Sequence, residues 1–129
     1  MATSLKAAQK NMEAIKMEKE ILVISLDFIF GPISKDFQDE NGNEITGIKV
    51  VDEDQISQKF DKEINDLYCS LWIPNVNEPS GYSFNDEGEK ELAPKLLSLI
   101  ERLIDRLNEI NDGSFEIEDM ITDHLKSLL

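Results

Sequence analysis

An apolar repeat in the C-terminal third restricts the fold of this chain more than any other feature. Between Glu89 and Ile110, leucine and isoleucine recur three and four residues apart, at Leu92, Leu96, Leu99, Ile100, Leu103, Leu107 and Ile110. Residues at these spacings share one face of an α-helix, so we predict a helix over about 89–110 with a buried apolar face. Pro94 has no amide proton and suits a first turn, which predicts a separate turn over 86–93.

Two further segments have helical spacing. From Asp54 to the stop at Pro74, apolar residues recur at Ile56, Phe60, Ile64, Leu67, Tyr68 and Leu71. They predict a helix of about five turns over about 54–72. Gly113 suits the C-terminal cap of the 89–110 helix. After it, a last helix over about 116–128 is predicted from Ile117, Met120, Ile121, Leu125 and Leu128.

The segment 20–30, EILVISLDFIF, is rich in β-branched and aromatic residues and stops at Gly31-Pro32. It predicts a buried strand, although a buried helix has the same pattern in so short a run. The turn signal Asn41-Gly42 precedes a second predicted strand over about 44–51. The chain is therefore predicted to be α+β and helix-rich, with a small antiparallel sheet (20–30 and 44–51) on three helices. A mostly α bundle is the alternative.

The charge is distributed unevenly along the 129 residues, a length that fits one domain. Residues 1–19 hold four lysines and two glutamates, and carry an apolar stripe of Leu5, Ala8, Met12 and Ile15. They predict a basic N-terminal helix or extension. The formal net charge is −14 for the whole chain, so residues 20–129 carry −16 and are predicted to form a single acidic globular domain.

This acidic balance restricts the partners. Nucleic acids and anionic membranes are bound mainly through Lys and Arg, so neither is expected as a partner. A cationic protein is expected instead, because opposite fields accelerate encounter. The single cysteine, Cys69, cannot form an internal disulfide, and we find neither a signal peptide nor a membrane-spanning segment. A cytoplasmic protein is therefore expected.

Catalytic and metal-binding motifs are weak. If Gly113 is aligned with the invariant glycine of a calcium-binding EF-hand, Ile110 falls on a ligand position, and isoleucine cannot bind calcium. A loop starting at Asp39 fails in the same way, with Val50 at its last position. His124 is the only histidine, and its neighbour Asp123 does not face it on a helix. We expect no metal, no cofactor and no enzymatic activity.

The acidic residues divide into those that helix formation explains and those that it does not. Negative charge is favourable at a helix N-terminus. Predicted helix starts explain Asp52, Glu53, Asp54, Asp86, Glu87, Glu89, Glu91, Glu116, Glu118 and Asp119. Two groups remain: one runs along the long helix towards its C-terminus (Glu101, Asp105, Glu109, Asp112), and one crowds a loop and hairpin (Asp36, Asp39, Glu40, Glu44).

These features resemble, in character, the small acidic immunity proteins of bacterial toxin systems, including those of contact-dependent growth inhibition. The resemblance covers residues 20–129 and includes runs such as DFQDENGNE and DRLNEINDGSFEIED. It implies a cytoplasmic antitoxin that binds and neutralises a basic toxin domain, often a nuclease. The expected partner-binding residues are Asp36, Asp39, Glu40, Glu44, Tyr82, Glu101, Asp105, Glu109 and Asp112, with Tyr82 as an aromatic anchor.

Other classes stay open. The chain could be a non-catalytic adaptor or a homo-oligomerising protein whose acidic surface only keeps it soluble, the usual role of charge runs. Monomer and homodimer are both compatible with the sequence. An enzyme or a calcium-responsive switch is the third class.

Overall fold

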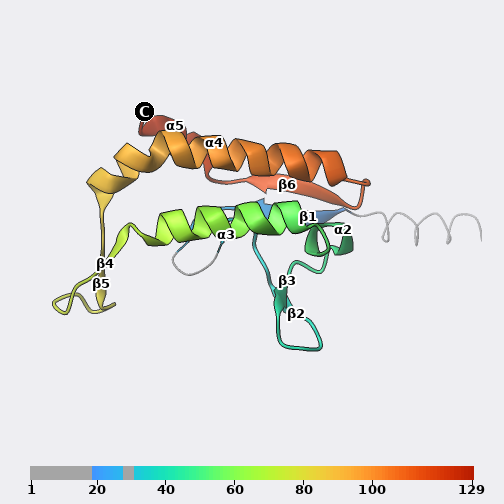
Figure 1. Cartoon of the computed structure of the whole chain (residues 1–129), viewed down its shortest axis with the longest axis horizontal. Helices are drawn as coiled ribbons and strands as arrows, with labels where there is room; N and C mark the ends of the chain where they lie inside the picture. Colours follow the sequence, from blue (N-terminus) through green and yellow to red (C-terminus); the bar gives the residue numbers. More distant parts are fainter. Residues whose placement is uncertain (1–18, 28–30) are drawn as a thin grey trace, which may run out of the picture.

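The computed structural model describes residues 19–27 and 31–129, and the chain is of the α+β class (Figure 1). The predicted N-terminal helix or extension lies outside the described residues except for Lys19. Within the described ranges, no helix combines the length and the apolar composition needed to cross a bilayer.

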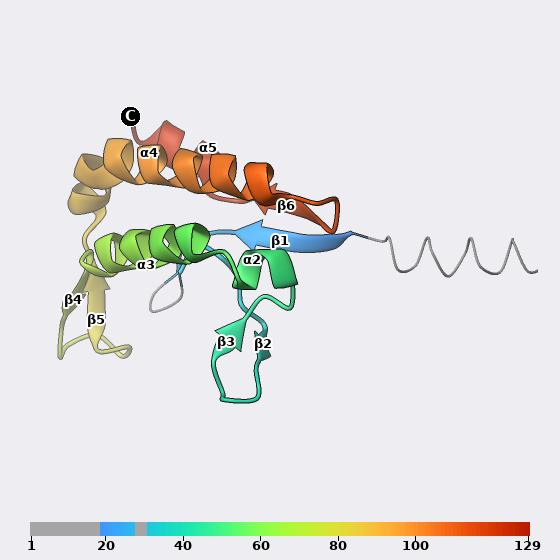
Figure 2. The same cartoon turned by 45° about the vertical axis from the view of Figure 1, so that its right-hand side comes forward.

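The centre of the fold is a parallel pair of strands covered by two helices. Strands β1 (Glu20–Ile24) and β6 (Phe115–Asp119) pair in parallel. Helices α3 (Gln55–Cys69) and α4 (Asp86–Ile110) run along the same face of this pair (Figure 2). Buried side chains of all four elements form the core, including Leu22, Phe115, Ile64, Ile100 and Leu103. The helix predicted over 54–72 is thus confirmed as α3.

The long helix begins earlier than predicted. Asn85 accepts a hydrogen bond from the Gly88 amide at 3.0 Å, so the helix starts at Asp86 and the separate turn over 86–93 is wrong. Pro94 lies inside α4 and cannot donate to the preceding turn. Figure 1 shows α4 bending near its N-terminal end, which is the usual effect of an internal proline.

The predicted sheet of 20–30 with 44–51 is wrong. Strand β3 (Glu44–Ile45) pairs instead with β2 (Phe37–Gln38) as an antiparallel hairpin, and residues Lys49–Asp52 form the short helix α2. Gly47 ends the extended run with a φ of 82°, and the Asp52 side chain accepts from its amide at 3.1 Å. Strand β1 ends at Ile24, and residues 28–30 lie outside the described ranges.

The last predicted helix is also largely wrong. Residues Phe115–Asp119 form β6, and α5 covers only Thr122–Ser127. The Asp119 carboxylate accepts from the Ile121 and Thr122 amides, both at 3.0 Å, and this turn separates β6 from the start of α5. Phe115 is fully buried, and the alternation of apolar and acidic residues after it fits a strand.

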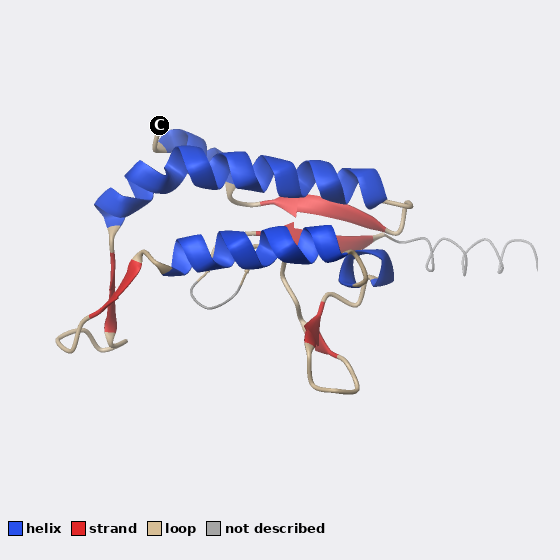
Figure 3. Ribbon diagram, viewed as in Figure 1, coloured by secondary structure: helices blue, strands red, loops and turns tan. Residues whose placement is uncertain are grey.

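Two hairpins project from the body on the same side. Strands β4 (Trp72–Pro74) and β5 (Tyr82–Phe84) connect α3 to α4, and the Trp72 and Phe84 rings meet edge to face at 5.0 Å. Figures 1 and 2 show β4–β5 and β2–β3 extending from opposite ends of α3, both away from α4. Figure 3 shows these hairpins as the red segments outside the central layer.

Candidate protein-binding surface

The β2–β3 hairpin and the residue before it, residues 36–45, hold four of the predicted partner-binding carboxylates, and we call this segment the acidic hairpin. Its turn is built by Asp39, whose side chain accepts from the amides of Asn41 at 2.8 Å and Asn43 at 2.9 Å. The hydrogen bonds from Asn43 hold the pKa of Asp39 below its ordinary value. Gly42 has a φ of 82°, which a turn tolerates best at glycine. The turn therefore stays ordered with Asp39 ionised.

The base of the acidic hairpin is fixed by a second carboxylate, Asp52 of α2. It accepts from the Thr46 amide and the Thr46 hydroxyl, both at 2.8 Å. Phe37 lies above this base with 59% of its surface exposed, and a Cβ added at Gly47 would lie 3.0 Å from its ring. An aromatic side chain is thus presented to solvent on an ordered support, and sequence reasoning missed it.

The other carboxylates of the hairpin, those of Asp36, Glu40 and Glu44, are exposed. Within residues 19–27 and 31–129, neither they nor Asp39 form an ion pair. This group of the predicted site is therefore uncompensated by the described part of the chain.

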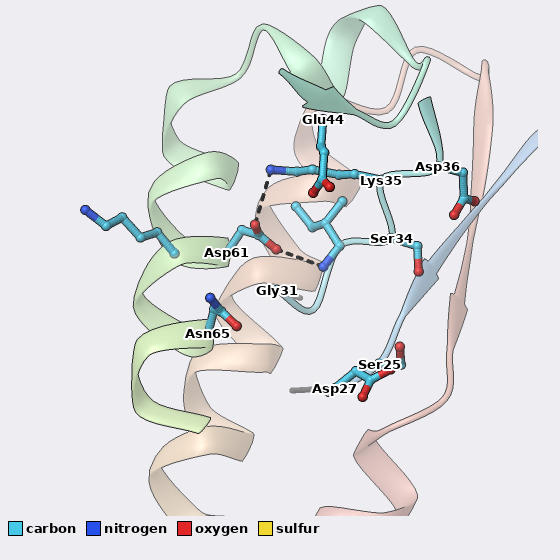
Figure 4. A pocket seen from close by; sticks show the side chains of 11 residues that line it. Ser25, Asp27, Gly31, Ser34, Lys35, Asp36, Glu44, Asp61 and Asn65 are labelled. Carbon is cyan, nitrogen blue, oxygen red and sulfur yellow. Dashed lines mark hydrogen bonds and ion pairs between the residues drawn. The ribbon is translucent and has the colours of Figure 1, made fainter. Parts of the chain in front are cut away.

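The nearest lysine in sequence, Lys35, forms its ion pair with a residue outside the hairpin. Lys35 Nζ lies 3.3 Å from Asp61 Oδ2 (Figure 4). It also donates a hydrogen bond to Gln58 Oε1 at 2.8 Å. Asp61 is buried, with 7% of its surface exposed, and also accepts from the Ile33 amide at 2.8 Å. Its burial raises the pKa of Asp61 above the ordinary value. Lys35 thus serves a buried acid of α3.

This ion pair lies in a polar pocket of about 450 Å³ between α3 and the chain leading to the hairpin. Ser25, Asp27, Ser34, Asp36, Glu44 and a second lysine, Lys62, line it along with Asp61 (Figure 4). Gly31, which predicts a strand stop in the sequence, is also required by this packing. A Cβ at Gly31 would lie 2.4 Å from Asp61 Oδ1, so the carboxylate needs a glycine there.

The acidic group of α4 has a different environment. Arg106 donates from Nη2 and Nε to the Asp54 carboxylate, at 2.7 and 3.1 Å, and from Nη1 to Glu109 at 3.1 Å. These contacts join α4 to Asp54, the N-cap residue of α3. The hydrogen bonds from Arg106 lower the pKa of Asp54 to about 2. Glu109 is therefore compensated by its own helix.

The rest of the α4 group is mixed. Asp112 follows the helix and accepts from the Ser114 amide at 3.1 Å, and the hydrogen bonds from Ser114 lower its pKa. Glu101 and Asp105 are exposed and form no ion pair with other described residues. Figures 1 and 2 show α4 and the acidic hairpin on opposite sides of α3. The structure therefore does not bring the two predicted groups together.

The predicted anchor, Tyr82, belongs to the other hairpin. It opens β5 with 38% of its surface exposed, near the fully solvated Val76. Figures 1 and 2 show β4–β5 at the far end of α3 from the acidic hairpin. Tyr82 shares its side of the molecule with the acidic hairpin but is not part of it, whereas Phe37 is.

The residues considered for catalysis lie elsewhere. His124 Nε2 is 3.1 Å from Glu89 Oε2, a buried carboxylate of α4, so His124 has a partner 35 positions away that sequence reasoning did not find. Cys69 donates to Asn65 Oδ1 at 3.3 Å within α3. In the part of the chain that the structure describes, no three histidine, cysteine or acidic side chains are grouped so as to hold a metal ion.

No protein-family model matches this chain, and neither the curated proteins nor the solved structures yield a match. What the chain can do is therefore inferred from its own geometry and charge.

Proposed function

We propose that this protein is a stoichiometric inhibitor, an immunity protein that binds the basic domain of a toxin in the cytoplasm and blocks it without catalysis. A nuclease is the favoured partner, because a surface that binds phosphates also attracts carboxylates. The acidic hairpin is the proposed contact surface, with Asp36, Asp39, Glu40 and Glu44 facing the cations of the partner.

One observation carries the proposal: four carboxylates stand on an ordered, projecting hairpin and form no ion pair within the described ranges. The adjacent Lys35 forms its ion pair with Asp61 and not with a hairpin carboxylate, although it lines the same pocket as Asp36 and Glu44. An ordered surface loses little conformational entropy on binding. A charged one accelerates association and couples to opposite charges by about 1.5 to 7 kcal/mol for a close pair.

Phe37 provides the acidic hairpin with an exposed apolar side chain that could act as an anchor. Charged residues at an interface determine rate and specificity, whereas buried aromatic anchors contribute much of the affinity. Phe37 is exposed between Asp36 and Asp39. In this proposal it replaces Tyr82 as the anchor and enters an apolar depression on the basic partner.

The test begins with the genes beside the one for this chain: any that encodes a large secreted protein with a basic C-terminal domain is selected, and that domain is co-expressed with this chain. The wild-type chain is expected to protect growth and to form a one-to-one complex. The double reversal Glu40→Lys with Glu44→Lys is expected to lose protection. The control Glu101→Lys with Asp105→Lys makes the same charge change on α4 and is expected to keep it.

Two outcomes count against the proposal in different ways. If the wild-type chain forms no complex with such a domain, the function is wrong. If the hairpin and α4 reversals lower protection equally while circular dichroism is unchanged, overall charge explains binding and the assigned surface is wrong.

The second class, an adaptor or homo-oligomer, is supported by the apolar β4–β5 hairpin. Ile73, Val76 and Tyr82 are exposed there, and Glu78 is the only charged residue between Trp72 and Phe84. An uncharged patch can associate with its own copy where the rest of an acidic surface repels. A concentration-dependent dimer in sedimentation, lost on Val76→Ser with Tyr82→Ser, would favour this class.

A further inference from the structure

Among residues 19–27 and 31–129, no strand lies beside one edge of the central strand pair. In this part of the chain the sheet consists of β1 and β6, and the far edge of β1 is occupied by residues 32–34, through hydrogen bonds from the Ser25 amide to the Pro32 carbonyl and from the Ser34 amide to the Val23 carbonyl. No described strand lies beside the far edge of β6. Parallel strands are usually buried within larger sheets, and two-stranded pairs are marginal. The free edge of β6 is therefore the place where a further strand would complete the sheet.

The hydrogen-bond pattern identifies which backbone groups face this edge. The Ser114 carbonyl accepts from Glu20, and the Met120 amide donates to Ile24, so even-numbered residues of this segment turn their backbones towards β1. In a parallel pair, alternate residues bond to the neighbouring strand. The amide and carbonyl of Ile117 therefore point away from β1, and no described group outside the strand pair bonds to them.

The side chains along β6 are acidic on the face away from the helices. Glu116 and Glu118 are exposed there, beside Ile21, which exposes 53% of its surface. A shallow hollow of about 330 Å³ is lined by these three residues and Ile117. Predicted helix starts explained Glu116 and Glu118 in the sequence, but that explanation is wrong because both lie in a strand. Glu116 forms an exposed ion pair with Lys19, whose Nζ lies 3.8 Å from Glu116 Oε1, whereas Glu118 forms none with a described residue.

We propose that the free edge of β6 binds an extended cationic segment of a partner protein by strand addition. The segment alternates apolar side chains, which lie beside Ile117 on the core side, with Lys or Arg beside Glu116 and Glu118 on the outer face. The Ile117 amide and carbonyl provide the backbone hydrogen bonds. This inference uses a different surface from the acidic hairpin and does not depend on it.

Charge selects this occupant over a second copy of the chain. Antiparallel pairing of two β6 strands centred on Ile117 would place Glu116 of one copy opposite Glu118 of the other, and like charges directly opposite are destabilising. The same carboxylates attract a strand that carries Lys or Arg. They also discourage self-pairing at the edge, which natural sheets avoid with charged residues.

The test uses the full-length ¹⁵N-labelled chain and two capped peptides. The lysine peptide alternates lysine with valine, and the control, the glutamate peptide, alternates glutamate with valine. The lysine peptide is expected to shift the Ile117 amide resonance and slow its hydrogen exchange, and the glutamate peptide to do neither. The double variant Glu116→Lys with Glu118→Lys is expected to weaken binding of the lysine peptide by roughly tenfold. The matched variant Glu40→Lys with Glu44→Lys is expected to change it much less.

Four results would overturn the inference. The first is a wild-type Ile117 amide that is already protected from exchange without peptide, since the edge would then be occupied. The second is equal binding of both peptides. The third is loss of binding in the hairpin variant rather than the β6 variant, which would assign the peptide to the acidic hairpin. The fourth is sedimentation showing wild-type dimers that Glu118→Lys alone strengthens, since the new lysine of one copy would then face Glu116 of the other; this would assign the edge to a second copy.

Discussion

The acidic hairpin and the C-terminal half of α4 carry the same kind of residues but differ in what surrounds them. On α4, Arg106 binds Glu109 and reaches across to Asp54, so part of the acidic group is used within the fold. At the hairpin, Lys35 turns away to buried Asp61. The two regions differ in which carboxylates Arg106 and Lys35 pair with. These pairings depend on contacts between elements far apart in sequence. Counting charges in a segment does not show which of them remain for a partner.

The largest effect on stability is expected at the contact between α4 and α3. Asp54→Ala removes the cap of α3, where the Ser57 amide donates to Asp54 at 2.9 Å, together with the partner of Arg106. We expect a loss of about 1 to 2 kcal/mol in the free energy of unfolding, measured with urea. Asp105→Ala, on the same helix without an ion pair among the described residues, is the control and should change it by less than about 0.5 kcal/mol. If both variants lost the same free energy of unfolding, carboxylates with an ion pair in the fold would contribute no more to stability than carboxylates without one.

The pH dependence of stability sharpens the same contrast. The pKa of Asp54 falls from 3.8 to about 2 in the folded protein, chiefly through its hydrogen bonds from Arg106. The stabilisation is therefore complete above the unfolded pKa and is lost as pH falls through the folded one. The difference in unfolding free energy between wild type and Arg106→Ala should thus shrink between about pH 5 and about pH 2. A constant difference over this range would contradict the assignment.

The pH dependence of stability that Asp61 contributes has the opposite sign to that of Asp54. It does not affect the difference between wild type and Arg106→Ala. Its burial raises its pKa, so protonation favours the folded state, and its contribution to stability increases as pH falls through the raised value. Because Asp61 is present in both chains, its effect cancels in the difference between them.

A smaller, local effect is expected from Asp39→Ala. The substitution removes the acceptor for the Asn41 and Asn43 amides, so the turn of the acidic hairpin opens more often. Hydrogen exchange at these two amides should accelerate several-fold while exchange in α3 and α4 is unchanged. Asp36→Ala is the control in the same hairpin. If exchange at the turn is unaltered, Asp39 is not what orders the hairpin.

The smallest effect is expected from Glu40→Gln with Glu44→Gln. Both residues are exposed and form no ion pair within the described residues, so the free energy of unfolding should change by less than about 0.5 kcal/mol. A clear loss of stability would mean that these carboxylates already serve the fold, and they would then be poor candidates for a partner.

Local sequence patterns predicted the helices well and the sheets poorly. The spacing around Ile64 and Leu103 gave α3 and α4, because one buried face is enough to define an amphipathic helix. The partner of β1 was not predictable, since β6 lies about 90 residues away in sequence and reads equally well as helix. Short-range turn chemistry at Gly47 decided where the predicted second strand ended.

The candidate site was predictable in composition but not in arrangement. The crowding of Asp36, Asp39, Glu40 and Glu44 is visible in the sequence, and the structure keeps them on one hairpin. Three features required coordinates: the diversion of Lys35 to Asp61, the separation of α4 from the hairpin, and the exposure of Phe37. Each of these depends on tertiary packing rather than on neighbours in sequence.

The most direct test is the association rate between this chain and the basic domain proposed as its partner, measured by stopped flow at low and high salt. We predict that Glu40→Lys with Glu44→Lys slows association at low salt by at least roughly tenfold, with a smaller effect at high salt. Glu101→Lys with Asp105→Lys should slow it far less. Equal slowing by the two variants, or no slowing by either, would contradict the claim that the acidic hairpin is the surface that meets the partner.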